Sequence, residues 1–227
     1  MPDYLGLGIT NIPLHPYIHA HSEATASVDM LRASKTFLNS IGKELNNQLF
    51  LTGYSQGGHA TMALHRLIEQ QLSGEFTVTA SSPMSGPYDI SGTQAEVITN
   101  DSVYSQPAFL PLVMFGLNPV YNLFAAPGDV INPLYELFIP PLMNGNYSTG
   151  DVNAVMPAIP NQILEPAVLD SFRTDPNHYF RVALQQNDVY DWLPQAPVKM
   201  FYCEADEQVA YQNTFVAYNQ FIANGAN

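Results

Sequence analysis

One stretch, residues 48–60 (QLFLTGYSQGGHA), constrains the fold of this chain more than any other. The apolar run Leu49–Leu51 predicts a short buried strand, and Gly53, Ser55 and Gly57 make a Gly-x-Ser-x-Gly turn directly after it. Apolar residues then recur at spacings of three and four, which predicts an amphipathic helix: Ala60, Ala63, Leu64, Leu67 and Ile68. A strand, a tight turn and a helix in this order present the serine at the carboxyl end of a strand.

The composition of the turn indicates that Ser55 is a nucleophile. A serine at the apex of so tight a turn has a strained backbone, and Gly53 and Gly57 keep Cβ atoms away from it. The N–H groups at the start of the following helix can stabilise an oxyanion. The alternative is an ordinary strand-to-helix turn with an ordinary serine, but it does not explain glycine on both sides of Ser55.

The totals exclude several classes of partner. The chain has 227 residues, enough for one domain or for one domain with a large insertion, and 46% of them are hydrophobic. Twenty acidic and seven basic side chains give a net charge of −13, which argues against binding to nucleic acid or to an anionic membrane surface. Cys203 is the single cysteine, so no intrachain disulfide forms, and its apolar neighbours predict a buried, inert thiol.

Targeting signals are not evident in the sequence. No apolar stretch is long enough for a membrane span, so we expect no stable membrane insertion. The opening residues 1–4 (MPDY) do not have the charged and apolar regions of a signal peptide. The sequence therefore leaves the compartment undetermined.

The segments on either side of this stretch complete an α/β pattern, a parallel sheet flanked by helices. Strands are predicted at residues 76–80 (FTVTA) and 196–202 (APVKMFY), with the end of another at 1–8 (MPDYLGLG). A helix capped by Ser22 is predicted before the nucleophile turn. In an open parallel sheet the loops after Asp3, Ser55 and Ala80 then share the ligand-binding edge.

The middle of the chain has a different character. Ten of the eighteen prolines fall between Pro107 and Pro166, and residues 109–124 are strongly apolar and carry no charge. One interpretation is a helical subdomain with its own core; the other is a lid whose inner face binds an acyl chain. We therefore predict a core formed by residues 1–90 and 196–227, with a mostly helical, Pro-rich cap inserted at 91–195.

Asp206 is the candidate acid that would orient a catalytic histidine. It follows the predicted strand at 196–202, on the same edge as Ser55, and it fits the order Ser, Asp, His of α/β-hydrolases. Two alternatives remain open: Glu204 in the same loop as the acid, and Asp206 as the cap of a helix at about 211–223.

The position of the general base is not evident, because no histidine follows Asp206. We expect His59 to be a packing residue and His65 to lie on the polar side of its helix. His15, His19 and His21 form a loose cluster without the acidic or cysteine ligands that a metal site needs. His178 could serve as the base only if the cap folds back; otherwise the chain is a shortened one, whose histidine would follow residue 227.

These motifs resemble a known family, the α/β-hydrolases of the secretory lipase type, which includes the fungal lipase A enzymes and many bacterial esterases. The resemblance rests on four motifs that span nearly the whole chain: residues 2–6 (PDYLG), 15–17 (HPY), 53–59 (GYSQGGH) and 205–209 (ADEQV). The cap is the least similar part. Family members have further strands before the first motif and a strand and a His-Gly turn after the acid, so the chain resembles a member shortened at both ends.

The resemblance implies ester hydrolysis by a Ser-Asp-His triad, with Ser55 as nucleophile and Asp206 as acid. It also implies an oxyanion hole formed by the backbone N–H of Gln56 and by Asp3. It is compatible with a secreted or periplasmic protein.

The sequence thus predicts a serine carboxylester hydrolase, an esterase or lipase, that cleaves uncharged hydrophobic esters without a cofactor or metal. Two alternatives are a truncated, catalytically impaired hydrolase that binds apolar ligands and a serine peptidase of the same fold. So few strands would leave a bare sheet edge, so we also expect self-association, a homo-oligomer in which a partner could supply the base.

Overall fold

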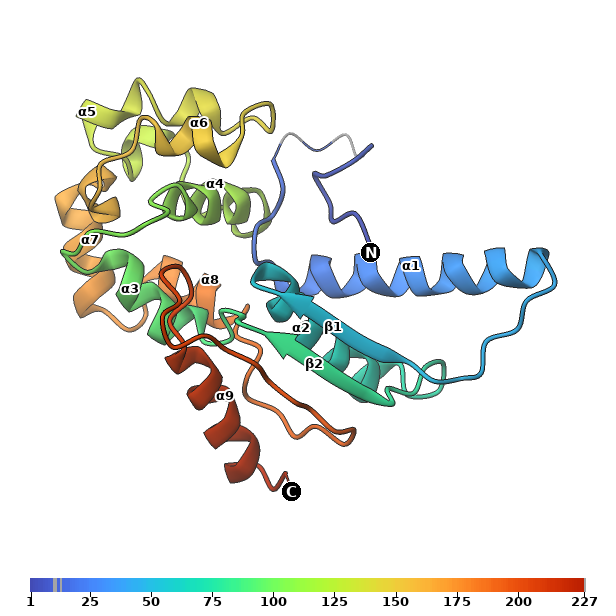
Figure 1. Ribbon diagram of the computed structural model, residues 1–227. Helices are drawn as coiled ribbons and strands as arrows, with labels where there is room; N and C mark the ends of the chain where they lie inside the picture. The colour runs from blue at the N-terminus through green and yellow to red at the C-terminus, as the bar shows by residue number, and fades with distance from the viewer. Residues whose placement is uncertain (10–11, 13, 227) are drawn as a thin grey trace. The chain divides into compact units, whose positions relative to one another are not determined.

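The computed structural model describes residues 1–9, 12 and 14–226, which form two compact units (Figure 1). The first comprises Met1–Tyr4, Ala20–Asp89 and Asp188–Asn227, and the second Leu5–His19 and Ile90–Asn187. These limits differ in three places from the predicted division into core and cap. Residues 5–19 and Ile90 are grouped with the predicted cap, and residues 188–195 with the predicted core.

The first unit is built around a parallel strand pair and the helix that connects it. Strand β1 (Phe50–Tyr54) leads through Ser55 into α2 (Gln56–Gln71), and the chain returns in β2 (Ala80–Met84). The register pairs Phe50 with Ala80 and Tyr54 with Met84. Helix α2 packs against both strands and against α1 (Ala20–Ser40), as Figure 1 shows.

A third segment, residues 198–201, extends this pair without forming a continuous strand. It makes parallel bridges from Val198 to Ser81 and from Phe201 to Met84. The Ser81 N–H donates to the carbonyl of Pro197, and the Phe201 N–H to the carbonyl of Pro83. Pro83 has no N–H to return a bond, so the ladder is interrupted there, and the strand predicted at 196–202 is reduced to two bridges.

The core of the first unit lies between these strands and its helices. Leu51, Met62, Ile68 and Tyr88 are among the buried residues of this cluster. Helix α9 (Gln212–Ala223) contributes Ala217 and Phe221 to the same cluster.

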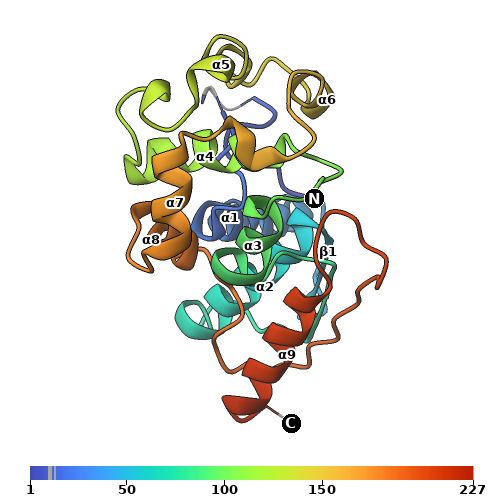
Figure 2. The same ribbon diagram turned by 90° about the vertical axis from the view of Figure 1, so that its left-hand side faces the viewer.

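The second unit is helical. Its elements are η1 (Ile90–Gln94, a π-helical turn), α3 (Ala95–Thr99), α4 (Phe109–Tyr121), η2 (Pro127–Asp129), α5 (Pro133–Glu136), η3 (Pro140–Leu142), α6 (Thr149–Asn153), η4 (Pro160–Ile163), α7 (Pro166–Thr174) and α8 (Tyr179–Gln185). Prolines occupy the first position of α5 and α7, where the fixed φ suits a helix start and the missing N–H costs nothing. Helix α4 lies between α3 on one side and α5 and α6 on the other (Figure 2). This unit has a separate core, which includes Leu117, Ile131 and Ile163.

Several predictions about local structure are wrong. The segment 1–8 is not a strand, and the second strand begins at Ala80 rather than at Phe76. Helix α1 begins at Ala20, so Ser22 lies inside it, buried, and does not cap it. Cys203 is exposed, because it lies in the loop beyond the bridge at Phe201.

In the described part of the chain, no helix combines the length and the apolar character that crossing a bilayer requires.

Candidate active site

Ser55 has the backbone conformation that the turn predicts. Its φ is 57° and its ψ is −122°, in the left-handed half of the map that side chains other than glycine rarely adopt. The Ser55 N–H donates to the carbonyl of Met84 at 2.9 Å, and its own carbonyl accepts the N–H groups of Gly58 (2.8 Å) and His59 (3.2 Å). Strain of this kind persists only where the surroundings fix the backbone, and it is concentrated at functional sites.

The glycines of the turn have unequal roles. A Cβ at Gly53 would lie 2.0 Å from the carbonyl oxygen of Gly57, and one at Gly58 would lie 2.6 Å from the carbonyl oxygen of Met84. A Cβ at Gly57 would meet nothing within 4 Å. Glycine is therefore required at positions 53 and 58, where another backbone segment comes too close for a Cβ. The prediction that a Cβ must also be absent at Gly57 is wrong.

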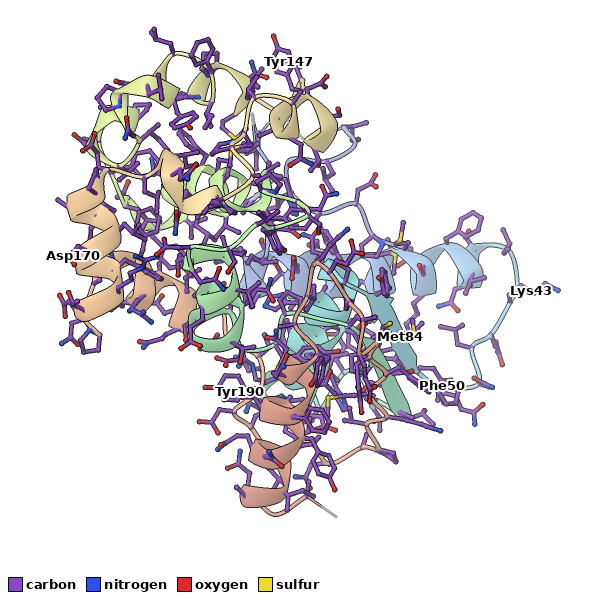
Figure 3. All side chains as sticks on the ribbon, turned by 60° about the vertical axis from the view of Figure 1, so that its left-hand side comes forward. Lys43, Phe50, Met84, Tyr147, Asp170 and Tyr190 are labelled. Atoms are coloured by element: carbon purple, nitrogen blue, oxygen red, sulfur yellow. The ribbon has the colours of Figure 1, made fainter. Side chains whose placement is uncertain are left out.

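Ser55 lies at the edge where the carboxyl ends of β1 and β2 meet. Tyr54 pairs with Met84, and Met84 is bridged to Phe201, so the loops that follow all three residues leave from one edge. In Figure 3 the label Met84 marks this end of β2, and Phe50 marks the opposite end of the strand pair. Such an edge is where parallel sheets place their ligands.

Asp206 is in the loop that follows Phe201. Its Oδ1 accepts the backbone N–H groups of Gln208 (2.9 Å) and Val209 (3.0 Å), and it is half-buried. The N-cap residue of α9 is Tyr211, and the N–H groups that Asp206 accepts lie before this helix, so the alternative that Asp206 caps it is wrong. Glu204 is exposed.

The two predicted oxyanion residues belong to the first unit. Gln56 is the first residue of α2, and its side-chain Nε2 donates to Oε1 of Glu23 at 2.8 Å. Asp3 is exposed, and its neighbour Tyr4 is half-buried.

Both histidines of α2 are completely buried. His59 packs in the interior as predicted, and its Nδ1 donates to Oε2 of Glu23 at 2.7 Å. The prediction for His65 is wrong, because its ring packs edge-on against Trp192 instead of facing solvent. Its Nε2 donates to Glu69 at 2.9 Å and its Nδ1 accepts from the Ser81 hydroxyl at 2.9 Å. Burial lowers the pKa of His65, although the Glu69 carboxylate raises it.

His178 belongs to the second unit. It is buried, it precedes α8 as its N-cap, and its Nδ1 accepts the Phe180 N–H at 3.3 Å. Its ring packs against Phe172, Tyr179 and Phe180. Burial lowers the pKa of His178, and the Arg181 charge also lowers it, whereas the Asp175 charge raises it. These contacts pack the His178 ring into the interior of its own unit.

Among the described residues, no group of three His, Cys, Asp or Glu side chains is arranged to hold a metal ion. The nearest sequence candidate was the trio His15, His19 and His21. His15 Nδ1 instead bonds to the carbonyl of Leu5 at 2.7 Å.

Sequence reasoning missed Glu23. It lies in α1, more than thirty residues before the partners that its carboxylate meets. No local pattern distinguishes it from a solvent-facing glutamate, since only the packing of α1 on α2 buries it.

The strand–turn–helix around Ser55, with its parallel strands, defines the class: an α/β-hydrolase-like fold. No family model matches the chain, and neither does any curated protein. Among solved structures it is similar to the rice cell wall degrading esterase LipA from Xanthomonas oryzae, with 32% identity and a TM-score of 0.89 over 99% of this chain and 60% of that one. A putative hydrolase from Legionella pneumophila matches with 28% identity, the same TM-score and the same coverage.

Candida antarctica lipase A shares the fold at 20% identity, with a TM-score of 0.66 over 93% of this chain and 48% of that one. The resemblance to lipase A-like hydrolases and bacterial esterases is therefore confirmed. The chain spans 60% of the length of the esterase LipA chain that it matches.

Proposed function

We propose that the chain is a serine carboxylester hydrolase that acts on uncharged, hydrophobic esters. The observation that carries the proposal is the backbone of Ser55, which has a left-handed φ of 57° between a parallel strand and the first turn of α2. The similarity to an esterase at 32% identity supports ester bonds as the target, over the amide bonds of a peptidase.

In the proposed reaction the Ser55 hydroxyl attacks the ester carbonyl carbon and gives up its proton to a base. The negative charge that develops on the carbonyl oxygen is stabilised by the Gln56 N–H at the start of α2, together with the backbone N–H of Asp3, the second oxyanion residue that the resemblance implies. Collapse of the tetrahedral intermediate breaks the bond to the alcohol, which leaves with a proton, and water then hydrolyses the acyl-Ser55 ester. Asp206 would orient the base.

The substrate class is argued from the second unit. Its core contains a partly open cavity of about 70 Å³ lined almost entirely by apolar side chains, among them Ile98, Leu110, Met114, Leu164 and Phe172. Pockets lined by apolar side chains favour apolar ligands. We propose that the second unit is a cap and that this cavity accepts part of an acyl chain.

The test is hydrolysis of p-nitrophenyl esters by the parent chain and by Ser55→Ala. Ser73→Ala is the matched control, because Ser73 is an exposed serine just beyond the C-terminal end of α2. Turnover should be lost in Ser55→Ala alone, and a fluorophosphonate should add its mass to the peptide that contains Ser55. Turnover that survives in Ser55→Ala would refute the assignment of the nucleophile.

The base is tested separately with His178→Ala. If His178 is the base, turnover and labelling of Ser55 by the fluorophosphonate both fall while the variant stays folded, because both reactions need the base to take the hydroxyl proton. If His178 only packs in the interior of its unit, the variant loses stability and each folded molecule keeps the parent rate. A parent chain that binds apolar esters without turnover would support the alternative of an impaired hydrolase. The apolar cavity of the second unit is the observation that favours this alternative.

A further inference from the structure

The carboxylate of Glu23 is completely buried in the first unit, although burying a charge is costly unless it is paired and hydrogen-bonded. Both of its oxygens have partners on α2. Oε1 accepts from Nε2 of Gln56 at 2.8 Å, and Oε2 accepts from Nδ1 of His59 at 2.7 Å. A carboxylate of α1 therefore binds two side chains of one neighbouring helix.

These two partners lie in the turn of helix that carries the nucleophile. Gln56 directly follows Ser55, and His59 lies one turn further along the same helix. The His59 backbone N–H also donates to the carbonyl of Ser55 at 3.2 Å. Any shift of His59 relative to α1 would therefore move the carbonyl of Ser55 and the peptide that joins Ser55 to Gln56.

The charge of Glu23 also reaches the segment that carries Asp3. Burial raises the pKa of Tyr4 to about 12, and the charge of Glu23 contributes to this shift, so the phenol lies within electrostatic reach of Glu23. Glu23 thus bonds to the start of α2 and acts electrostatically on the segment that ends at Tyr4.

We infer that Glu23, His59 and the side chain of Gln56 form a positioning network, which holds the Gln56 backbone N–H where the oxyanion develops. The inference rests on the proposed esterase function and adds Glu23, His59 and the side chain of Gln56 to it. None of the three side chains needs to touch the substrate, because the network acts through the backbone at residues 55 and 56. Removing one oxyanion donor lowers kcat by about 100- to 1,000-fold. We expect a donor that is only misplaced to lose part of this effect.

The test compares two buried histidines of the same helix. His59→Leu removes the donor to Glu23, and His59→Asn keeps a donor close to the position of Nδ1. His65→Leu and His65→Asn are the matched controls, since His65 is equally buried on α2 but bonds to Glu69 and Ser81. Gln56→Ala is the second probe of the network; Gln56 is half-buried, so this variant should fold even if His59→Leu does not.

The readouts are kcat and KM for p-nitrophenyl esters, normalised to the fraction of chains whose Ser55 reacts with a fluorophosphonate. We expect His59→Leu and Gln56→Ala to lower kcat by about 10- to 100-fold with KM changed less than about twofold, and His59→Asn to recover most of the loss. His65→Leu should lower the unfolding midpoint and leave kcat per labelled site within about twofold of the parent.

Equal losses of kcat in His59→Leu and His65→Leu would overturn the inference, because packing alone would then explain them. Parent-like kcat in Gln56→Ala would also overturn it, while leaving the esterase proposal intact. A parent chain with neither turnover nor an adduct at Ser55 would instead refute the proposed function, and the inference with it.

Discussion

The closest backbone approach at the site lies between Gly53 and the first turn of α2, and Gly53→Ala tests it. An added Cβ would lie 2.0 Å from the carbonyl oxygen of Gly57 and 2.4 Å from its carbonyl carbon, although real Cβ atoms essentially never approach other atoms closer than 3.0 Å. The backbone would have to move by about 1 Å, and the atoms in the way belong to the main chain and cannot rotate aside. Overpacking by one methyl group costs about 1–3 kcal/mol, so we expect a loss near the upper end, about 3 kcal/mol.

Gly57→Ala is the matched control, because a Cβ there meets nothing within 4 Å and the position is inside α2. We expect it to leave the free energy of unfolding unchanged or to raise it by about 0.4–1 kcal/mol, because alanine reduces the entropy of the unfolded chain. Urea denaturation followed by tryptophan fluorescence suits this comparison, since the single Trp192 is buried in the core of the same unit. A Gly53→Ala variant within 1 kcal/mol of Gly57→Ala would refute the close approach.

Three further predictions concern acid stability, association and the cavity. Burial lowers the pKa of His65 below its ordinary 6.5, so just below pH 6.5 the unfolded chain takes up a proton that the folded chain does not. The free energy of unfolding should therefore fall as the pH drops below 6.5, and it should fall less in His65→Asn. Urea titrations at several pH values would measure both. In the described sheet β1 pairs only with β2, and Phe50 is 63% exposed, so we propose that the chain self-associates through the free edge of β1. Light scattering should detect an oligomer, and Phe50→Lys should abolish it. A parent chain that is a monomer would refute the proposal. Ala95→Phe should fill part of the cavity and lower kcat/KM for long-chain esters relative to acetate esters. Val103→Phe, at an exposed position of the same unit, should leave this ratio unchanged. The same ratio of long-chain to acetate kcat/KM in both variants would refute the proposed acyl site.

The elements around Ser55 could be predicted because their signals are local. The apolar run, the glycine-flanked serine and the spacing of Ala60, Ala63 and Leu64 each lie within a few residues of what they determine, and β1 and α2 follow them closely. The helical character of residues 91–195 was also predictable, since the many prolines exclude long strands and several of them start helices.

The second strand could not be predicted at its observed position, because its stability comes from its neighbours. Ala80–Met84 (ASSPM) contains two serines and a proline and has little intrinsic strand preference. It becomes a strand because it lies between β1 and residues 198–201, which satisfy its backbone groups on both sides. The sequence 76–79 (FTVT) has the better composition but no such pair of neighbours.

The buried polar pairs were also missed because their partners lie on other elements of the fold. Together these pairs explain how the backbone at Ser55 is held in place. The buried residues of α2 include small ones such as Ala60 and Ala63, and small side chains alone would allow the helix to slide or rotate. His59 bonds to Glu23 of α1, whereas His65, on a different face of α2, bonds to Ser81 of β2 and to Glu69. Buried polar pairs add little net stability, but they fix the register of packed elements because only one arrangement satisfies them all.

Glu69 also fixes the position of the chain just before the third segment of the sheet. Its two carboxylate oxygens accept the backbone N–H groups of Gln195 and Ala196 at 2.8 Å, just before the segment bridges to β2. The chain then runs along β2 to Phe201 and into the loop that carries Asp206. One helix therefore sets the backbone of Ser55 at its first turn and, through Glu69, the entry of the segment that leads to Asp206. For this reason we expect Glu69→Ala, which removes both acceptors, to displace the segment that leads to Asp206, whereas His65→Leu leaves both of these bonds in place and should affect mainly stability.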